Sequence, residues 1–281
     1  MLSPSTAAGT AGLTAVIGEP RRALLAFDFD GVLSPIIEEP AAAQPLPGMF
    51  GALAALGRLT GPVAIVTGRP AEFLLARDGF DALTTIPDFS VYGHYGLERW
   101  STRSPRVRSL PVAADISAVR AELADLLRRP GPAAGSWLED KGSAVAVHTR
   151  RTPDPAAALA ALTEPVRDIA ARHQLRVEPG KMVLEIRPPG TSKGEVLRQV
   201  MTEKGTASVL YAGDDLGDLS AFAVIDEFRE AGMPGVKVCS ASAEAPQVAT
   251  AADLVVDGPA GIRGLLDDLR REIEGHRPVA G

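Results

Sequence analysis

The chain has 281 residues, of which 46% are hydrophobic and 23% are charged, and its formal net charge is −6. This composition indicates a soluble globular protein with one large domain or two smaller ones, and the negative charge argues against a nucleic-acid partner. No run of about 18 apolar residues predicts a membrane span, so we expect no membrane partner. The lone cysteine, Cys239, rules out an internal disulfide and favours the reducing cytoplasm, where we expect a monomer.

The first and last thirds of the chain alternate short apolar runs with helical patterns. Residues 1–20 show no signal-peptide pattern, and we expect this segment to be flexible. The strands predicted beyond it cover 23–27, 62–66, 89–93, 207–215, 235–240 and 252–258, and the helices cover 47–61, 70–79, 218–232 and 261–275. Runs that are apolar on both faces and are joined by helices predict an α/β fold with a Rossmann-like parallel sheet.

The middle of the chain has a different pattern. An amphipathic helix is predicted over 116–129, a hairpin turns at 140–142, a helix over 154–173 is interrupted or kinked near Pro165, and a second hairpin turns at 179–180. Helices with paired hairpins indicate an α+β cap inserted into the core domain. We therefore predict a core of residues 1–108 and 188–281, with a cap over 109–187. The flanking segments 103–111 and 187–194 are rich in Pro, Gly and Ser and suit hinges.

Polar side chains follow the predicted strands where each strand ends. Asp28 and Asp30 follow the first strand, Thr67 follows the second, and Asp214 follows a late one, while Lys193 lies in the first turn of a helix. Ligands of open parallel sheets bind at the carboxyl ends of the strands. Two acids at i and i+2 in extended backbone point to the same side and repel each other, which a bound cation would offset.

This set of groups suits phosphoryl transfer through a carboxylate. One Asp would attack phosphorus, Mg²⁺ would neutralise charge, and a second Asp would handle the proton of the leaving group. Each piece alone also has an ordinary explanation, as a loop acid, a helix cap or a solvated lysine. The order and spacing of the pieces together favour the catalytic interpretation.

The motifs resemble those of a known superfamily. DFDGVL at 28–33, a Thr that ends the next strand, a later Lys and GDD at 213–215 are similar to the haloacid-dehalogenase superfamily of phosphatases. Within it, WLEDKGSAVAVHTR, GKMVLEIRPPGTSKGEVL and YAGDDLGDLSAF resemble the trehalose-6-phosphate phosphatase family, and the resemblance covers nearly all of the chain from about residue 20 onward. It implies a haloacid-dehalogenase-like core with an inserted cap.

The resemblance also implies a role for each matching residue of the core. Asp28 is the nucleophile and a Mg²⁺ ligand, Asp30 is the general acid/base and a ligand through its backbone carbonyl, and Asp214 is the third ligand. Thr67 and Lys193 contact the phosphoryl group. Asp215 and Asp218 are supporting acids, and Gly68 and Arg69 contact substrate. The cap residues Glu139, Lys141 and Glu185 match positions that bind sugar hydroxyls. Without the resemblance, Glu139 and Lys141 read as an exposed ion pair at a hairpin, and Glu185 as an outward-facing strand residue.

Three segments depart from the family pattern. The usual Gly-x-His-Gly reads Gly93-His94-Tyr95-Gly96, so neither His94 nor Tyr95 is given a role. The acidic run after GDD reads LGDLS at 216–220, which weakens supporting roles beyond Asp218. Val32 stands where the family commonly has Thr, so phosphate contact there must come from the backbone.

The resemblance implies hydrolysis of trehalose 6-phosphate to trehalose and phosphate, the last step of trehalose biosynthesis. Three alternatives stay open at this point: a phosphatase for another sugar phosphate, such as sucrose phosphate or mannosylphosphoglycerate; a phosphosugar mutase; and a catalytically silent sugar-phosphate-binding module. All catalytic positions are filled, which argues against the silent module.

Overall fold

The computed structural model describes residues 2–110, 116–140, 144–180, 182–241 and 246–276. The chain forms two compact units, one of Met1–Ser109 with Ser192–Gly281, and one of Leu110–Thr191. We call the first unit the core and the second unit the cap. The boundaries that the sequence predicts for the cap are 109 and 187.

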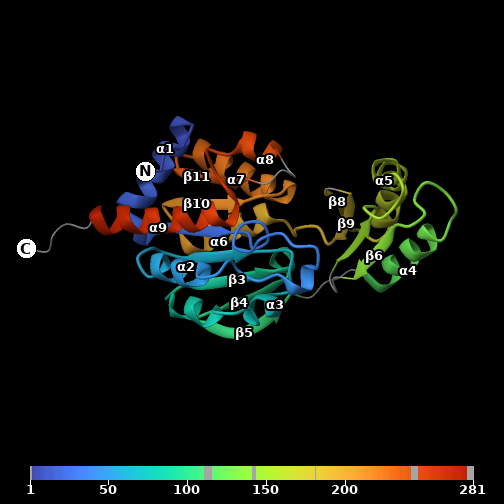
Figure 1. The fold of residues 1–281 in the computed structure, drawn as a ribbon, viewed down its shortest axis with the longest axis horizontal. Helices are drawn as coiled ribbons and strands as arrows, with labels where there is room; N and C mark the ends of the chain where they lie inside the picture. The colour runs from blue at the N-terminus through green and yellow to red at the C-terminus, as the bar shows by residue number, and fades with distance from the viewer. Residues whose placement is uncertain (1, 111–115, 141–143, 181, 242–245, 277–281) are drawn as a thin grey trace, which may run out of the picture. The chain divides into compact units, whose positions relative to one another are not determined.

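The core is built on one sheet of eight strands in the order β12-β11-β10-β1-β2-β3-β4-β5 (Figure 1). Neighbours from β12 to β3 pair in parallel, and β4 and β5 are antiparallel. The strands are β1 (Ala23–Phe27), β2 (Val63–Val66), β3 (Phe89–Gly93), β4 (Glu98–Ser101), β5 (Ser104–Ser109), β10 (Ser208–Gly213), β11 (Gly235–Ser240) and β12 (Leu254–Val256). The fold class is therefore the predicted α/β class with a large parallel sheet.

Helices cover both faces of this sheet. The first layer comprises α1 (Ala7–Gly18), α2 (Met49–Gly57), α3 (Ala71–Leu75) and α9 (Gly258–His276), and the second comprises α6 (Lys193–Lys204), α7 (Leu219–Glu230) and α8 (Pro246–Ala251). Each layer encloses its own apolar cluster against the sheet. Every residue of β1 and β10 is buried, which explains why these strands are largely apolar on both faces.

Helix α1 corrects the expectation that residues 1–20 are flexible. Thr6 caps the helix by accepting a hydrogen bond from the Gly9 backbone N–H at 2.9 Å. A Cβ at Gly12 would overlap the carbonyl oxygen of Gly235, so the helix backbone packs directly on β11. Such packing depends on small residues, which leave no strong apolar period in the sequence.

Strand β5 corrects the expectation of a hinge over 103–111. The segment is rich in Pro and Arg, but Ser104–Ser109 pairs with β4 at the edge of the sheet. Val107 packs against the apolar cluster of the first layer, while most other side chains of β5 are exposed. An edge strand accepts Pro and charged residues because one of its sides needs no partner.

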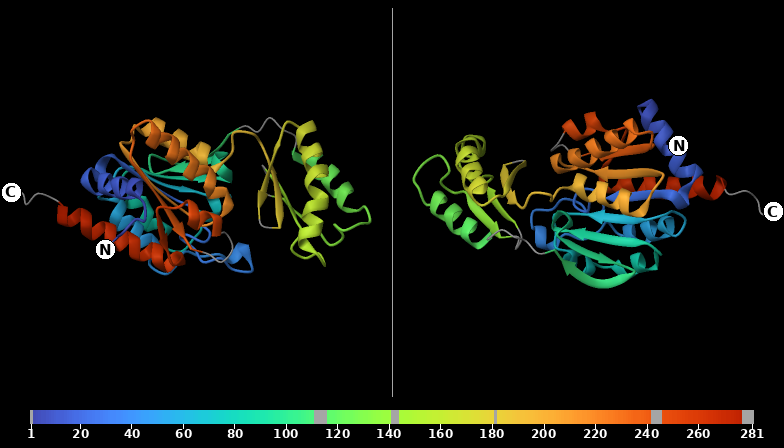
Figure 2. Two further views of the ribbon diagram at one scale, coloured as in Figure 1. Left: turned by 90° about the horizontal axis from the view of Figure 1, so that it is seen from above. Right: turned by 180° about the vertical axis from the view of Figure 1, so that it is seen from behind.

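The described residues of the cap form a four-stranded antiparallel sheet in the order β6-β7-β9-β8 with two helices on one face (Figure 2). Its elements are α4 (Ile116–Leu127), β6 (Trp137–Asp140), β7 (Val145–His148), α5 (Pro155–Arg172), β8 (Arg176–Gly180) and β9 (Val183–Arg187). An apolar cluster lies between the helices and the sheet. Helix α5 continues through Pro165, and β8 includes 179–180, where the sequence predicts the turn.

Within the described ranges, no helix combines the length and apolar character needed to cross a membrane.

Candidate active site

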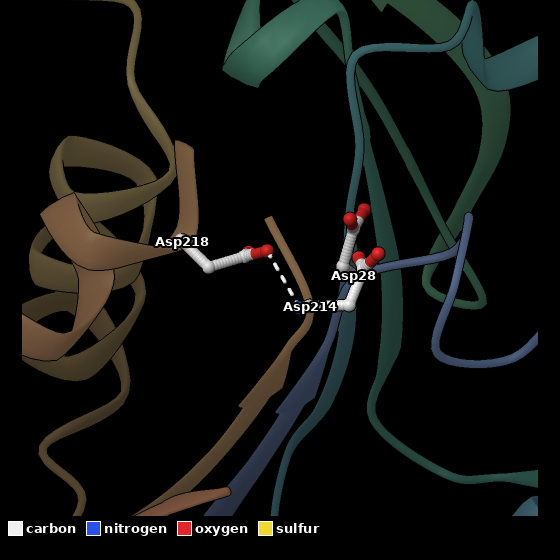
Figure 3. A group of neighbouring side chains, drawn as sticks. All are labelled: Asp28, Asp214 and Asp218. Atoms are coloured by element: carbon white, nitrogen blue, oxygen red, sulfur yellow. Dashed lines mark hydrogen bonds between the residues drawn. The ribbon is translucent and has the colours of Figure 1, made fainter. Parts of the chain in front are cut away.

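The predicted core residues meet at the carboxyl ends of β1 and β10. Phe27 of β1 pairs with Ala212 of β10, so Asp28 and Asp214 leave the sheet at the same edge. One carboxylate oxygen from each of Asp28, Asp214 and Asp218 lies within 4.8 Å of the other two, and all three residues are buried. Figure 3 shows the carboxylates of Asp28 and Asp214 close together, with Asp218 reaching toward the backbone of Asp214 from another element.

Lys193 joins this group from the first residue of α6. Its Nζ lies 2.7 Å from Asp28 Oδ2, 2.8 Å from Asp218 Oδ1 and 3.1 Å from Asp215 Oδ1. Its side chain is 3% exposed, so its contacts with the buried Asp28 and Asp218 are protected from solvent. Burial alone would lower the pKa of Lys193, but the surrounding carboxylates raise it well above its usual value, and the ammonium stays charged.

Asp218 is held by the chain itself. It accepts a hydrogen bond from the Tyr211 hydroxyl at 2.6 Å and from the backbone N–H groups of Asp214 and Asp215 at 3.0 Å each. Asp215 and Asp218 also cap the short helical turn Leu216–Asp218 reciprocally. These bonds fix the loop that carries Asp214, which fits a supporting role for Asp218.

Burial and mutual repulsion disfavour the charged forms of Asp28, Asp214 and Asp218, and Lys193 opposes this only in part. Burial, followed by the neighbouring carboxylates, raises the pKa of Asp214 to about 9, and burial raises the pKa of Asp28 well above its usual value although Lys193 opposes the shift. Burial likewise raises the pKa of Asp218 to about 6. An additional cation would therefore be stabilised beside these carboxylates.

The donor set fits a hard divalent cation such as Mg²⁺, which prefers oxygen ligands. Asp28 and Asp214 are the side chains best suited to hold it, because Asp218 is already engaged by Tyr211 and two backbone N–H groups. The oxygen-only chemistry of the acids and their raised pKa values are the observations behind this fit.

Gly31, within DFDG, makes room for Asp214. Its φ is +71°, and a Cβ there would overlap the carboxylate of Asp214. Its carbonyl accepts a hydrogen bond from the buried Ser240 hydroxyl at 2.6 Å, which keeps the turn in place. The glycine of the motif is thus required both by backbone conformation and by the close approach of an acid.

We expect Gly31→Ala to lower the free energy of unfolding by roughly 2 kcal/mol, because it adds a clash to the strain of a positive φ. Gly79→Ala is the matched control, since Gly79 has a φ of +76° and no heavy atom within 4 Å of a new Cβ. Urea unfolding of both variants separates the two contributions. Equal losses would show that the approach of Asp214 imposes no requirement at residue 31.

Asp30 lies beside the cluster with its carboxylate paired to Arg69. Arg69 donates to Asp30 through Nε and Nη2, both at 2.8 Å, and its Nη1 donates to the carbonyl of Pro40 at 2.7 Å. The guanidinium also lies 4.5 Å from the centre of the Phe73 ring. Two residues that the sequence gives separate roles are therefore joined by a bidentate ion pair.

Thr67 and Gly68 follow β2 in a tightly packed turn. Thr67 is 1% exposed and its hydroxyl accepts from the Arg69 backbone N–H at 3.1 Å. A Cβ at Gly68 would lie 2.6 Å from the Tyr95 hydroxyl, so Tyr95 packs against this turn. His94 and Tyr95 have φ values of +46° and +54°. Consecutive positive φ values outside glycine are uncommon and concentrate near functional sites.

In the cap, the register of the sheet aligns Glu139 and Glu185. Each pairs with Ala146, from opposite sides, so both glutamates are on the same face of the sheet. Glu185 is 8% exposed, and its neighbour Arg187 lies 3.4 Å from Glu178 and 3.9 Å from Glu185. Lys141, the third predicted cap residue, lies outside the described residues.

Several residues of these sites are missing from the sequence-based prediction. Tyr211, Ser240 and Arg187 each contact a predicted residue or its loop through a buried polar group. Tyr211 lies inside the predicted strand 207–215, and its hydroxyl among apolar neighbours is a signal that would have identified it. Ser240 and Arg187 end strands that also contain Lys237 and Glu185, so they give no such signal.

Comparison with solved structures identifies the fold. The C-terminal domain of a Candida albicans trehalose-6-phosphate phosphatase superposes with a TM-score of 0.74 at 22% identity, covering 96% of this chain and 98% of that one. A haloacid dehalogenase-like hydrolase from Bacteroides thetaiotaomicron superposes with a TM-score of 0.59 at 17% identity, covering 88% and 99%. With acids at the ends of β1 and β10, this is the fold of the haloacid-dehalogenase-like hydrolases.

The sequence relationships are more specific. The sequence model of the family described as trehalose-phosphatase matches residues 26–260, and the chain belongs to this family. The chain is 33% identical over 260 residues to a trehalose-phosphate phosphatase of Mycobacterium tuberculosis H37Rv, covering 90% of this chain and 62% of that protein. With the relative from Mycobacterium leprae it shares 31% identity, over 90% of this chain and 58% of that protein. The chain thus spans less than two thirds of the length of these relatives.

Proposed function

We propose that this chain hydrolyses trehalose 6-phosphate to trehalose and inorganic phosphate. The observation that carries the proposal is the buried contact of 2.7 Å between Asp28 and Lys193, at the end of β1 and beside Asp214. The substrate is inferred from the family match and from the names of the relatives. Release of phosphate from trehalose 6-phosphate, compared with other sugar phosphates, tests the proposal.

Asp28 supplies the nucleophile in the proposed reaction. One carboxylate oxygen attacks phosphorus, and the bond between phosphorus and the sugar oxygen breaks. Asp30 gives a proton to the departing sugar oxygen and then accepts one from the water that hydrolyses the aspartyl-phosphate, which returns Asp28 to its starting state. Arg69 occupies both oxygens of Asp30, so this pair opens before Asp30 exchanges the proton.

The remaining core residues bind and orient. Lys193, already in contact with Asp28, offsets negative charge on the phosphoryl group, and the Thr67 hydroxyl hydrogen-bonds to it. Gly68 and Arg69 line the same turn and contact substrate. Asp215 and Asp218 hold Lys193 and the loop of Asp214 in place.

We propose that Asp28 and Asp214 hold Mg²⁺ through their side chains and Asp30 through its backbone carbonyl. When bound, Mg²⁺ supplies positive charge that stabilises the phosphoryl oxygens. We further propose a monomeric cytoplasmic enzyme with no nucleic-acid or membrane partner, which fits the net charge of −6 and the single cysteine.

Removal of divalent cations with EDTA is expected to stop phosphate release, and added Mg²⁺ is expected to restore it. The reason is that an all-oxygen donor set suits a hard cation better than zinc. Activity is measured by phosphate release after dialysis and after addition of each metal. Full restoration by Zn²⁺ alone, without recovery in Mg²⁺, would contradict the assignment.

We propose that Glu139, Lys141 and Glu185 of the cap recognise the sugar. A disaccharide presents many hydroxyls and few charges, and a carboxylate accepts from two hydroxyls at once. Glu139 and Glu185 flank Ala146 on the same face of the sheet, so one ligand could contact both, which supports this proposal. Neighbouring strands are about 5 Å apart, so the backbones of the two glutamates are about 10 Å apart across the strands.

Glu185→Ala is expected to lower kcat/KM for trehalose 6-phosphate about tenfold, since a hydrogen bond to a charged group contributes about 1.5–3 kcal/mol. Hydrolysis of p-nitrophenyl phosphate should fall much less, because this ester has no sugar hydroxyls. Glu164→Ala, on an exposed pair with Arg167 in the same unit, is the control. Equal losses of Glu185→Ala on both substrates would assign Glu185 to stability instead.

A further inference from the structure

A histidine, a tryptophan and a glutamate form a connected group on the face of the cap sheet that carries Glu185. The rings of Trp137 and His148 are stacked, with centroids 4.2 Å apart and an interplanar angle of 9°. His148 Nε2 lies 2.9 Å from Glu139 Oε2. The guanidinium of Arg151 lies 5.0 Å from the centre of the Trp137 ring.

The register of the hairpin produces this group. Trp137 of β6 pairs directly with His148 of β7, and Glu139 is two residues further along β6 on the same face. A directly opposite pair brings two flat rings into contact, and a diagonal neighbour remains within reach of a long side chain. The imidazole can therefore stack on the indole and bond to the carboxylate at the same time.

The contact restricts the Glu139 carboxylate. An ionised carboxylate only accepts hydrogen bonds, so the proton of this bond is on His148 Nε2. The side chain of Glu139 is 39% exposed, and an exposed glutamate not held in this way samples several rotamers. Stacking fixes the imidazole, and the imidazole in turn fixes one carboxylate oxygen of Glu139.

We propose that His148, held by Trp137, is a positioning residue that sets the Glu139 carboxylate for recognition of sugar hydroxyls. The inference rests on the proposed function, and it assigns to His148 and Trp137 a part in substrate selection. A preset carboxylate loses less conformational freedom when substrate binds, so its hydrogen bond contributes more to affinity.

The same unit contains a matched pair for comparison. His173 Nε2 lies 2.6 Å from Glu122 Oε1, between the end of α5 and α4. This pair has the same chemistry, but it joins the two helices, which pack on the opposite face of the sheet from Glu139. Its loss should therefore leave the choice of substrate unchanged.

The experiment measures kcat and KM of the parent chain and of single and double variants on trehalose 6-phosphate and p-nitrophenyl phosphate. His148→Ala should raise KM for the sugar phosphate about tenfold with a much smaller change in kcat, and His173→Ala should not. His148→Gln, whose amide N–H can replace Nε2–H, should recover most of the loss, whereas the shorter His148→Asn should not. In a Glu139→Ala background, His148→Ala should add less than about twofold.

Three results would overturn the inference alone: equal losses on both substrates, equal behaviour of His148→Gln and His148→Asn, or full additivity of His148→Ala with Glu139→Ala. Thermal unfolding of each variant identifies any that fails to fold, and the Gln and Asn pair then decides the outcome. A parent chain that hydrolyses p-nitrophenyl phosphate but not trehalose 6-phosphate would instead overturn the proposed function, and this inference with it.

Discussion

Asp28→Asn is expected to abolish phosphate release while the chain stays folded. An amide is a poor nucleophile and brings no charge to a metal, so we expect turnover to fall by roughly a thousandfold or more. The fold should tolerate the change because the pKa of Asp28 is raised, which means that the folded state disfavours its charged form. Lys193 keeps Asp215 and Asp218 as partners in the variant.

Phosphate release and thermal unfolding of Asp28→Asn test this expectation together. The exposed Asp78, substituted in the same way, controls for the chemistry of the replacement elsewhere in the core. Activity of Asp28→Asn within tenfold of the parent would contradict an aspartyl-phosphate mechanism. Loss of the folded state would contradict the account of its electrostatics.

Lys193→Met is expected to abolish turnover and also to destabilise the core. Removing this ammonium leaves Asp28, Asp215 and Asp218 close together without their shared cation, and breaking a buried ion pair typically costs about 3–5 kcal/mol. The sign follows from the raised pKa of Lys193, since the folded state stabilises its charged form.

Urea unfolding checks this prediction, with Lys237→Met as the matched control. Lys237 is also largely buried, but its partner Asp226 is half exposed and keeps an ion pair with Arg229, so its loss should be clearly smaller. A Lys193→Met chain as stable as the parent would show that the contacts of Lys193 with Asp28 and Asp218 do not stabilise the core, which would contradict the raised pKa of Lys193.

The position of the acids could be predicted from the sequence because it depends only on where the strands end. Asp28 and Asp214 each follow a run whose residues are all buried, and parallel neighbours bring such ends together whatever the details of packing. To predict the contact of Lys193 with Asp28, the start of a helix also had to be placed beside the carboxyl ends of these strands.

Contacts that depend on side-chain direction or strand register could not be predicted from the sequence. Arg69 and Asp30 are far apart in sequence, and their pairing depends on the direction in which the turn after β2 points the Arg69 side chain. Trp137 and His148 stack only in the register that the hairpin adopts, and the sequence predicts the hairpin without its exact pairing. Helix α1 was missed because glycine and alanine give close packing on β11 without an apolar period.

We expect the Asp28 cluster to release phosphate from trehalose 6-phosphate in preference to other sugar phosphates. The most direct test of this preference compares kcat/KM of the parent chain in Mg²⁺ for trehalose 6-phosphate, sucrose phosphate, mannosylphosphoglycerate and glucose 6-phosphate, with Asp28→Asn as the blank. We expect the value for trehalose 6-phosphate to exceed every other by about tenfold or more, the difference that one hydrogen bond to a charged group provides. An equal or higher value for another sugar phosphate, transfer of phosphate within the sugar instead of its release, or no release from any of them would contradict the account.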